Sequence, residues 1–274
     1  MGADAAAFSR LGARYRAELQ VHCYRLLGSL EESGELVPEA LSRAWHERES
    51  FAGQATFRTW LYRVATQVCL DRLASRPGAP PAPAPSSVQP CPDTLLEQVT
   101  GEVVTEETIG LAFVAALQSL PPRPRAVLVL RDVLGWPARE TAAALGVSVA
   151  AVNSALQRAR PRVRDRLPGR RASGPAGPDG AAVLRRYTEA LEEGDERALT
   201  AVLGERPHPR PPGLRCVPTW MNRQPAAALY TRGADEDAHR PHALEVLRVE
   251  DGRIAEITVF GPGLFAVVGL PAAL

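Results

Sequence analysis

The stretch ARETAAALGVSVAAVNSALQ, residues 138–157, decides how the middle of the chain is expected to fold. Its apolar residues follow a helical period on both sides of Gly146. Ala142 is small enough for two helices to touch, Gly146 accepts the left-handed backbone of a tight turn, and Val152 anchors the second helix. Ser148 is the expected N-cap of that second helix. The stretch therefore predicts a helix-turn-helix unit, whose second helix enters the major groove of DNA.

We expect the second helix to run from Val149 to about Arg160 and to expose polar side chains. Asn and Gln pair with adenine edges, and Arg pairs with guanine or phosphate. The candidate DNA-contacting residues of this unit are Ser148, Ala150, Asn153, Ser154, Gln157, Arg158 and Arg160. The alternative is that Gly146 is only a cap between two ordinary packed helices.

The distribution of charge favours the DNA-binding interpretation. The formal net charge is +1, but residues 77–122 contain no basic residue and carry Asp93, Glu97, Glu102, Glu106 and Glu107. Residues 157–171, in contrast, contain seven arginines and one aspartate. Such segregation is typical of a chain with an electrostatic partner. Because the arginines alternate along the chain and Pro161 is expected to kink or end the helix, we expect only Arg158 and Arg160 near phosphate.

A second candidate site lies in residues 51–63, FAGQATFRTWLYR, where aromatic side chains alternate with arginines. Aromatic rings stack on unpaired bases and arginines hold the backbone of a single strand. The spacing of Phe57, Trp60, Leu61 and Val64 also fits a core, so Trp60 is expected to be mainly packed. Outward-facing side chains are then expected at Arg58, Thr59, Tyr62 and Arg63. The loop 52–56 is a candidate receptor for a flipped-out base.

Composition divides the chain into two helical modules and a tail. Helical periods fill 8–75 and 93–167, while the proline-rich segment 76–92 cannot form a packed element because proline lacks an amide donor. A second linker spans 168–180. The remaining residues, 181–274, begin with an amphipathic helix that breaks near Gly194 and continue with alternating strands.

The tail contains a hairpin signal, with Asp251 and Gly252 between the apolar runs 246–249 and 254–260. We therefore expect two all-α helical modules followed by a small α+β domain.

Composition also indicates what the chain is not. No stretch reaches the roughly 18 uninterrupted apolar residues of a membrane span, and the first residues lack the apolar core of a secretory signal. Four widely spaced cysteines, Cys23, Cys69, Cys91 and Cys216, favour buried thiols over a disulfide framework or zinc site. We expect a cytoplasmic protein without membrane contact, metal ion or cofactor.

Two segments resemble a known family. FAGQATFRTWLYRVATQVCLDRL (residues 51–73) is similar to region two of extracytoplasmic-function (ECF) sigma factors, and LPPRPRAVLVLRDVLGWPARETAAALGVSVAAVNSALQRAR (residues 120–160) is similar to their region four. The resemblance implies an RNA polymerase sigma factor that binds core polymerase and promoter DNA. It places −35 recognition on the helix-turn-helix and −10 recognition on Gly53, Thr56, Phe57, Arg58, Thr59, Trp60 and Arg63. It places contact with the β′ clamp helices on Glu35, Leu36, Glu39, Arg43 and Trp45, with the β flap as a further partner.

This sequence departs from the family pattern at several positions. Glu35, Pro38 and Ala40 stand where the family usually has Asp, Gln and often Thr. A proline inside a helix removes a hydrogen bond and costs on the order of 3 kcal/mol, so Pro38 bears on polymerase binding. Gln67 replaces a common Asn, and Pro124 replaces a common Gln near a helix start, where proline is tolerated.

The tail resembles the SnoaL-like domain that follows some sigma factors, a cone of helices against a curved sheet with an inner pocket. Here only 11 residues separate Leu203 from Arg215, fewer than in the family, so a shortened pocket is expected. The resemblance implies that the tail modulates the sigma modules by contact within the same chain.

Two other functions fit parts of the sequence. A helix-turn-helix regulator that does not depend on core polymerase would explain residues 138–160 but not the aromatic module or the proline-rich tether. A SnoaL-like cyclase or isomerase would need an acid–base pair, for which the candidates are Asp235, Asp237, His239 and His242. No general base follows from the sequence, and a fold alone implies no activity, so we expect no enzyme and no catalytic residue.

Overall fold

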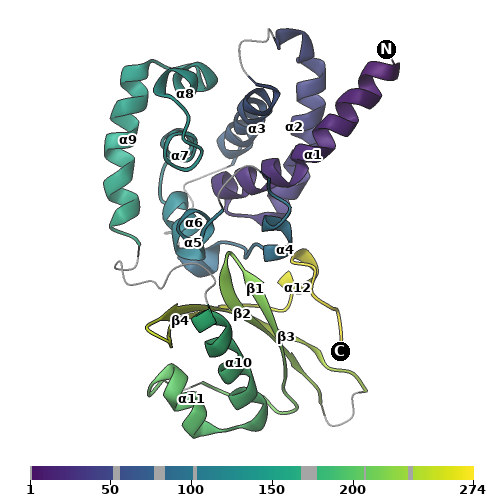
Figure 1. Cartoon of the computed structure of the whole chain (residues 1–274), viewed down its shortest axis with the longest axis vertical. Helices are drawn as coiled ribbons and strands as arrows, with labels where there is room; N and C mark the ends of the chain where they lie inside the picture. The colour runs from purple at the N-terminus through teal and green to yellow at the C-terminus, as the bar shows by residue number, and fades with distance from the viewer. Residues whose placement is uncertain are drawn as a thin grey trace. The chain divides into compact units, whose positions relative to one another are not determined.

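The computed structural model forms two compact units (Figure 1). The described residues are 2–51, 56–76, 84–100, 104–167, 178–206, 208–233 and 237–274. The predicted contact Gly53 and the catalytic candidate Asp235 therefore lie outside the described residues. The first unit comprises 1–88, 94–104 and 111–167, and the second comprises 89–93, 105–110 and 168–274. Among the described residues, no helix has the length and apolar character needed to cross a membrane.

The first unit begins with three long helices, α1 (Gly2–Leu27), α2 (Leu30–His46) and α3 (Phe57–Ala74). Side-chain caps fix two of their starts: Ser29 accepts a hydrogen bond from the backbone N–H of Glu32, and Thr56 accepts one from Thr59. Short helical turns follow, η1 (Arg48–Ser50), η2 (Pro85–Ser87) and α4 (Asp93–Leu96).

The same unit ends with the elements of the second predicted module. These are α6 (Leu111–Gln118), α7 (Pro122–Leu128), the π-helical turn η3 (Val129–Val133), α8 (Ala138–Leu145) and α9 (Val149–Arg164). Pro124 lies in the first turn of α7, where the missing amide costs no helix bond.

One apolar core runs through both predicted modules. It includes Leu36 and Trp60 of the first module together with Ala142 and Val152 of the second. The sequence predicted two separately tethered bundles, whereas the first unit holds both as one compact body.

The second unit is the small α+β domain that the sequence predicted, preceded by the short helix α5 (Glu106–Ile109). Its helices are α10 (Pro178–Glu193), α11 (Glu196–Leu203) and α12 (Leu264–Val267). Its strands β1 (Arg215–Met221), β2 (Gln224–Thr231), β3 (Arg240–Glu250) and β4 (Arg253–Phe260) form an antiparallel sheet in the order β1-β2-β3-β4. The helix break at Gly194 is confirmed, since this residue has φ 72° between α10 and α11.

Tight turns join the strands. The predicted hairpin is confirmed, because Glu250 pairs with Arg253 across the turn. The two turn residues, Asp251 and Gly252, have φ 50° and 72° respectively. The β1–β2 turn is similar, with Asn222 and Arg223 at φ 57° and 61°. The helices α10 and α11 cover one face of this sheet, where Tyr187 lies in the apolar core.

Candidate nucleic-acid interface

The helix-turn-helix has the geometry that the sequence predicted. Gly146 ends α8 with φ 63° and ψ 38°, in the left-handed region. The Ser148 hydroxyl accepts a hydrogen bond from the Ala151 amide at 3.1 Å and caps α9. Ala142 and Val152 are buried between the helices. These contacts orient α9 so that its opposite face points to solvent.

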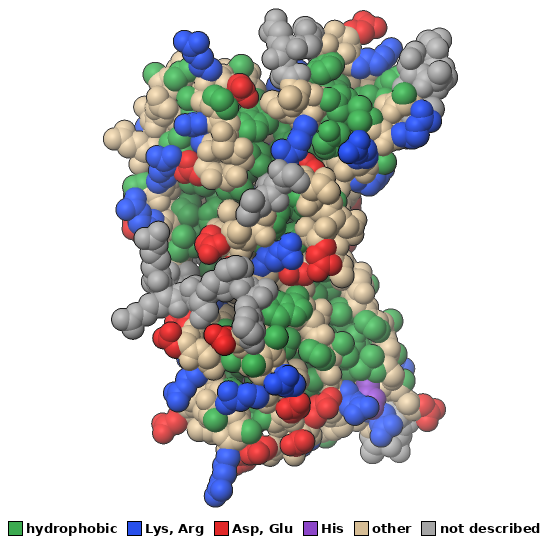
Figure 2. Space-filling model, viewed as in Figure 1, with side chains coloured by type: hydrophobic (Ala, Val, Ile, Leu, Met, Phe, Trp, Pro, Cys, Tyr) green, Lys and Arg blue, Asp and Glu red, His purple; other side chains and the backbone are tan. Residues whose placement is uncertain are grey.

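The residues predicted to contact DNA lie at the N-cap and along the solvent face of α9. All seven candidates are exposed: Ser148, Ala150, Asn153, Ser154, Gln157, Arg158 and Arg160. In Figure 2, arginine side chains follow the edge of the unit where Figure 1 places α9. An exposed polar helix face with arginines beside it is the arrangement that major-groove recognition requires.

The arginine-rich end of α9 differs in one respect from the expectation. The helix continues through Pro161 to Arg164 rather than ending at about Arg160. The Arg160 guanidinium makes two hydrogen bonds to the Asp132 carboxylate, at 2.9 and 2.7 Å. This pair raises the pKa of Arg160, chiefly through the hydrogen bond to Asp132. In this structure the guanidinium of Arg160 is thus already paired with a carboxylate.

The start of α3 forms the second predicted surface. Thr56 is exposed, and Phe57, Thr59 and Arg63 are partly exposed. Trp60 is buried to 4% exposure, so its expected role in packing is confirmed. Its ring lies 5.4 Å from Phe51 and 5.6 Å from Phe57, measured between centroids.

The prediction that Tyr62 faces outward is wrong. Tyr62 is 2% exposed and lies beneath Arg58, whose guanidinium carbon is 5.1 Å from the ring centroid. Buried Glu18 of α1 accepts a hydrogen bond from Arg58 Nε at 2.7 Å and from the Tyr62 hydroxyl at 3.4 Å. The Thr100 hydroxyl donates to the same carboxylate at 3.1 Å. Arg58, a predicted DNA contact, thus also holds α3 against α1.

The predicted polymerase contacts lie on α2 and divide into two groups. Glu35, Glu39 and Arg43 are exposed, and Trp45 is partly exposed beneath the Arg48 guanidinium. Leu36, in contrast, is fully buried in the core and lies away from the exposed face of α2.

Pro38 lies in the interior of α2 on its exposed face, and the helix continues past it to His46. Its ring therefore stands between Glu35 and Glu39 on the surface that the resemblance assigns to polymerase.

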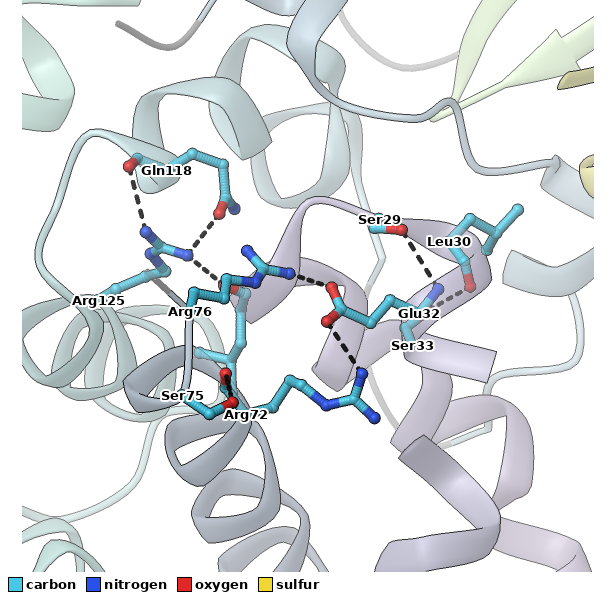
Figure 3. Close-up of polar contacts among 10 residues, drawn as sticks. Ser29, Leu30, Glu32, Ser33, Arg72, Ser75, Arg76, Gln118 and Arg125 are labelled. Carbon is cyan, nitrogen blue, oxygen red and sulfur yellow. Dashed lines mark hydrogen bonds and ion pairs between the residues drawn. The ribbon is translucent and has the colours of Figure 1, made fainter. Parts of the chain in front are cut away.

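Sequence reasoning missed the residues that join the two modules. Arg125 of α7 is 3% exposed and donates to the carbonyls of Gln118 and Leu120 at 3.1 and 2.9 Å, and also to Leu26 O at the end of α1. Figure 3 shows this guanidinium beside Gln118, with dashed lines to the side-chain oxygen and the backbone carbonyl of that residue. Burial, followed by the nearby charge of Arg76, lowers the pKa of Arg125 to about 10.

A second contact joins α3 to the helix-turn-helix. The Gln67 side-chain amide donates to the Ala144 carbonyl of α8 at 2.8 Å. A cavity of about 320 Å³ lies beside it, lined by Arg43, Glu47, Arg63, Val64, Gln67, Ala143 and Ala144. The −10 candidate Arg63 thus borders α8 in this arrangement.

The described catalytic candidates of the tail, Asp237, His239 and His242, lie just before or at the start of β3. Asp237 and His242 are exposed, and the backbone of His239 pairs with that of Leu274 at 3.1 and 3.0 Å. Among the described residues, no group of three or more His, Cys, Asp and Glu residues has an arrangement suited to a metal ion.

A buried polar cluster that the sequence did not indicate lies elsewhere in the domain. The Tyr187 hydroxyl donates to Glu245 at 2.7 Å and lies 3.0 Å from His208 Nε2. Burial raises the pKa of Glu245, while Tyr187 and His208 act in the opposite direction. The cavity of about 500 Å³ in this domain lies between α10 and β1, where Cys216 and Trp220 form part of its wall.

Comparisons with known proteins define the class. Residues 11–77 match the family model "Sigma-70 region 2", and residues 110–163 match "Sigma-70, region 4". The chain is 36% identical to the ECF RNA polymerase sigma factor SigG of Mycobacterium tuberculosis, over 97% of this chain and 85% of that protein. It is 32% identical to SigE of Mycolicibacterium smegmatis over 53% of this chain and 55% of that protein.

The fold agrees with a solved structure. The crystal structure of the M. tuberculosis ECF sigma factor SigJ matches 96% of this chain and 99% of its own, with a TM-score of 0.62 and 22% identity. The helical regions two and four followed by a small α+β domain are therefore a known arrangement. The chain belongs to the ECF family of RNA polymerase sigma factors. As a sigma factor it binds core RNA polymerase and promoter DNA. The family assignment therefore favours this function over a helix-turn-helix regulator that acts without core polymerase.

Proposed function

We propose that α9 reads the −35 element of the promoter. The observation that carries this proposal is the exposed polar face of α9, which is capped by Ser148 and oriented by the buried Val152. Asn153 and Gln157 lie one turn apart on this face and reach adenine edges, while Arg158 reaches guanine or phosphate. Arg160 adds a phosphate contact after leaving Asp132.

The start of α3 is proposed to receive the melted −10 strand. Thr56, Thr59 and Arg63 offer hydrogen bonds, and Phe57 offers the edge of an aromatic cluster for base stacking. Trp60 supports Phe57 from beneath, because its own ring is buried. We assign Trp60 a positioning role rather than a direct contact.

The exposed face of α2 is proposed to bind the β′ clamp helices of core polymerase, through Glu35, Glu39, Arg43 and Trp45. Region four is proposed to contact the β flap. We propose that the protein acts in the cytoplasm, together with core polymerase.

The first unit is proposed to be a closed arrangement of the two modules. Elements 10 and 35 base pairs upstream of a start site are separated by about 25 base pairs, or roughly 85 Å of duplex. Regions two and four share one core and the Gln67–Ala144 hydrogen bond. Binding both elements therefore requires the modules to separate, and the C-terminal domain is proposed to modulate that step.

Run-off transcription with core polymerase tests the assignment of α9. Arg158→Ala is expected to weaken promoter binding by about 5- to 100-fold, the cost of losing one good base contact. Arg186→Ala is the matched control, because Arg186 is an exposed helical arginine in the C-terminal domain. Equal promoter binding by the two variants would refute the proposed role of Arg158.

A further inference from the structure

Two pieces of the linker between the sigma regions belong structurally to the C-terminal unit. Residues 89–93 and 105–110 cluster with the α+β domain, whereas 94–104 cluster with the helical modules. The sequence assigned all of these residues to the proline-rich linker and the second helical module. Something in the C-terminal domain must therefore hold both pieces.

The side chain of Asn222 holds them both. Asn222 lies in the β1–β2 turn and is fully buried. Its Oδ1 accepts a hydrogen bond from the Cys91 amide at 2.7 Å, and its Nδ2 donates to the Ile109 carbonyl at 2.6 Å. Its backbone amide donates to the Cys91 carbonyl at 2.8 Å. One amide group thus connects two points of the linker that are distant in sequence.

The neighbouring residue strengthens the attachment with a charge. The Arg223 amide donates to Asp93 Oδ1 at 2.9 Å, and its guanidinium pairs with Asp93 Oδ2 at 3.3 Å. Asp93 is 8% exposed, so the pair is shielded from water. Met221 also forms a β-bridge with Pro92. We call the contacts of Asn222 and Arg223 with Cys91, Asp93 and Ile109 the linker clasp.

The backbone of the turn is suited to this role. Asn222 and Arg223 have φ 57° and 61°, in the left-handed region that Asn adopts more readily than most residues. Positive φ at both positions forms a two-residue turn, and both of its amides donate to the linker, that of Asn222 to the Cys91 carbonyl and that of Arg223 to Asp93 Oδ1. Cys91 and Ile109 are fully buried, so they anchor the clasped segments by apolar contact as well.

We propose that the β1–β2 turn is a binding site for the chain's own linker, and that the clasp must open before the two DNA-reading modules reach their promoter elements. This inference rests on the roles proposed above for α3 and α9. It adds a named pair of residues, Asn222 and Arg223, through which the C-terminal domain acts.

The length of the linker provides the physical reason. About 36 residues separate the end of α3 from the start of α6, and fully extended they span roughly 120 Å. With the clasp closed, the residues between Cys91 and Ile109 no longer add to the extended length of the linker, which falls to roughly 65 Å. The two promoter elements lie roughly 85 Å apart. Even when fully extended, a clasped linker is roughly 20 Å shorter than this separation, whereas an open linker is long enough to span it.

Thermodynamic linkage makes the proposal testable. If promoter binding requires an open clasp, a variant that weakens the clasp raises promoter affinity by up to the same factor. If the clasp stays closed on the promoter, the same variant leaves promoter affinity unchanged.

The experiment compares Asn222→Gly with Asp251→Gly in the full-length chain. Glycine preserves the positive φ at both positions, and Asp251 occupies the corresponding place in the β3–β4 turn with φ 50°. Hydrogen exchange of the Cys91 amide in the free chain measures the clasp. The promoter is first selected from random sequence with the wild-type holoenzyme. The affinity of each reconstituted variant holoenzyme for that promoter then measures function.

Loss of two hydrogen bonds by Asn222→Gly is expected to speed exchange of the Cys91 amide roughly tenfold or more, and to tighten promoter binding several-fold relative to Asp251→Gly. Asp93→Asn, which alters only the linker side, is expected to act in the same direction with a smaller effect, and it replaces Asn222→Gly if that variant does not fold. Unchanged exchange, or faster exchange with unchanged promoter affinity, would overturn the proposal. A wild-type holoenzyme that recognises no promoter would instead refute the roles proposed for α3 and α9.

Discussion

Acid is expected to destabilise the helical unit through one buried histidine, His22 of α1. His22 is fully buried, and its Nε2 lies 2.8 Å from the Thr66 hydroxyl. That hydroxyl donates its own proton to the Tyr62 carbonyl at 2.7 Å, so it accepts from the histidine. His22 is therefore neutral with its proton on Nε2. Its Nδ1 has no hydrogen-bond partner among the described residues, and a proton placed there would lack an acceptor.

The magnitude follows from the pKa. Burial, and after it the charge of Arg25, lowers the pKa of His22 from 6.5 to about 3. Below pH 6.5 the histidine is protonated in the unfolded chain but stays neutral in the folded chain. The unfolded state binds more protons, so the stability of the fold falls as the pH drops from 6.5 towards 3. Between pH 7 and pH 5 this one residue costs about 2 kcal/mol.

Urea unfolding of wild type and His22→Gln at pH 7 and pH 5 measures this cost. Glutamine keeps a donor for Thr66 and does not titrate. All other titrating groups are common to both proteins, so their contributions cancel in the comparison. We expect the wild type to lose about 2 kcal/mol more than the variant on acidification. Equal losses in the two proteins would refute the assignment of His22 as a buried neutral residue.

Three further predictions concern the remaining contacts. Gln67→Ala removes one hydrogen bond between the modules, so core polymerase is expected to bind about 2- to 10-fold more tightly; unchanged affinity in a binding titration would argue against a closed arrangement. Arg160→Ala breaks the ion pair with Asp132, which is largely exposed, so the free energy of unfolding measured by thermal denaturation is expected to change by less than about 1 kcal/mol. The slope of log affinity for duplex DNA against log salt concentration is expected to fall by about one. Burial raises the pKa of Glu245 above 4.5, so just above pH 4.5 the folded domain binds more protons at this group than the unfolded chain, and its stability rises as the pH falls towards 4.5. Glu245→Gln is expected to remove that rise in melting temperature, and an unaltered pH profile would contradict the assignment.

The parts of the site that sequence predicted well depend on local backbone rules. Gly146 and Ser148 were identified because a left-handed turn and a helix N-cap each favour few residue types. The exposed face of α9 followed from the spacing of Val152 and its apolar neighbours. The same reasoning placed the Asp251 turn correctly.

The parts that it missed depend on partners far away in the chain. The core spacing of α3 places Tyr62 outside, yet its hydroxyl donates to the buried Glu18, which lies 44 residues earlier in the chain. Arg125 looks like a surface cation in the sequence, and only the carbonyl ends of α1 and α6 explain its burial. The helical spacing of apolar residues distinguishes the buried from the exposed face of a single helix. It does not reveal which residues a second module, distant in the sequence, will cover.

Asn222 shows why deletion of the C-terminal domain is a poorer test of its role than a single substitution. Removing the domain after Arg171 would take away the hydrogen-bond partners of the Cys91 amide and the Ile109 carbonyl together with the apolar surface that buries both residues. A truncated chain would therefore have an exposed apolar linker as well as an open clasp, and the two changes have opposite expected effects, since the first promotes aggregation and the second frees the modules. Asn222→Gly leaves the apolar surface in place and removes only the side-chain hydrogen bonds. If the truncated chain is less active than the wild type while Asn222→Gly is more active, the domain both shields the linker and restrains it.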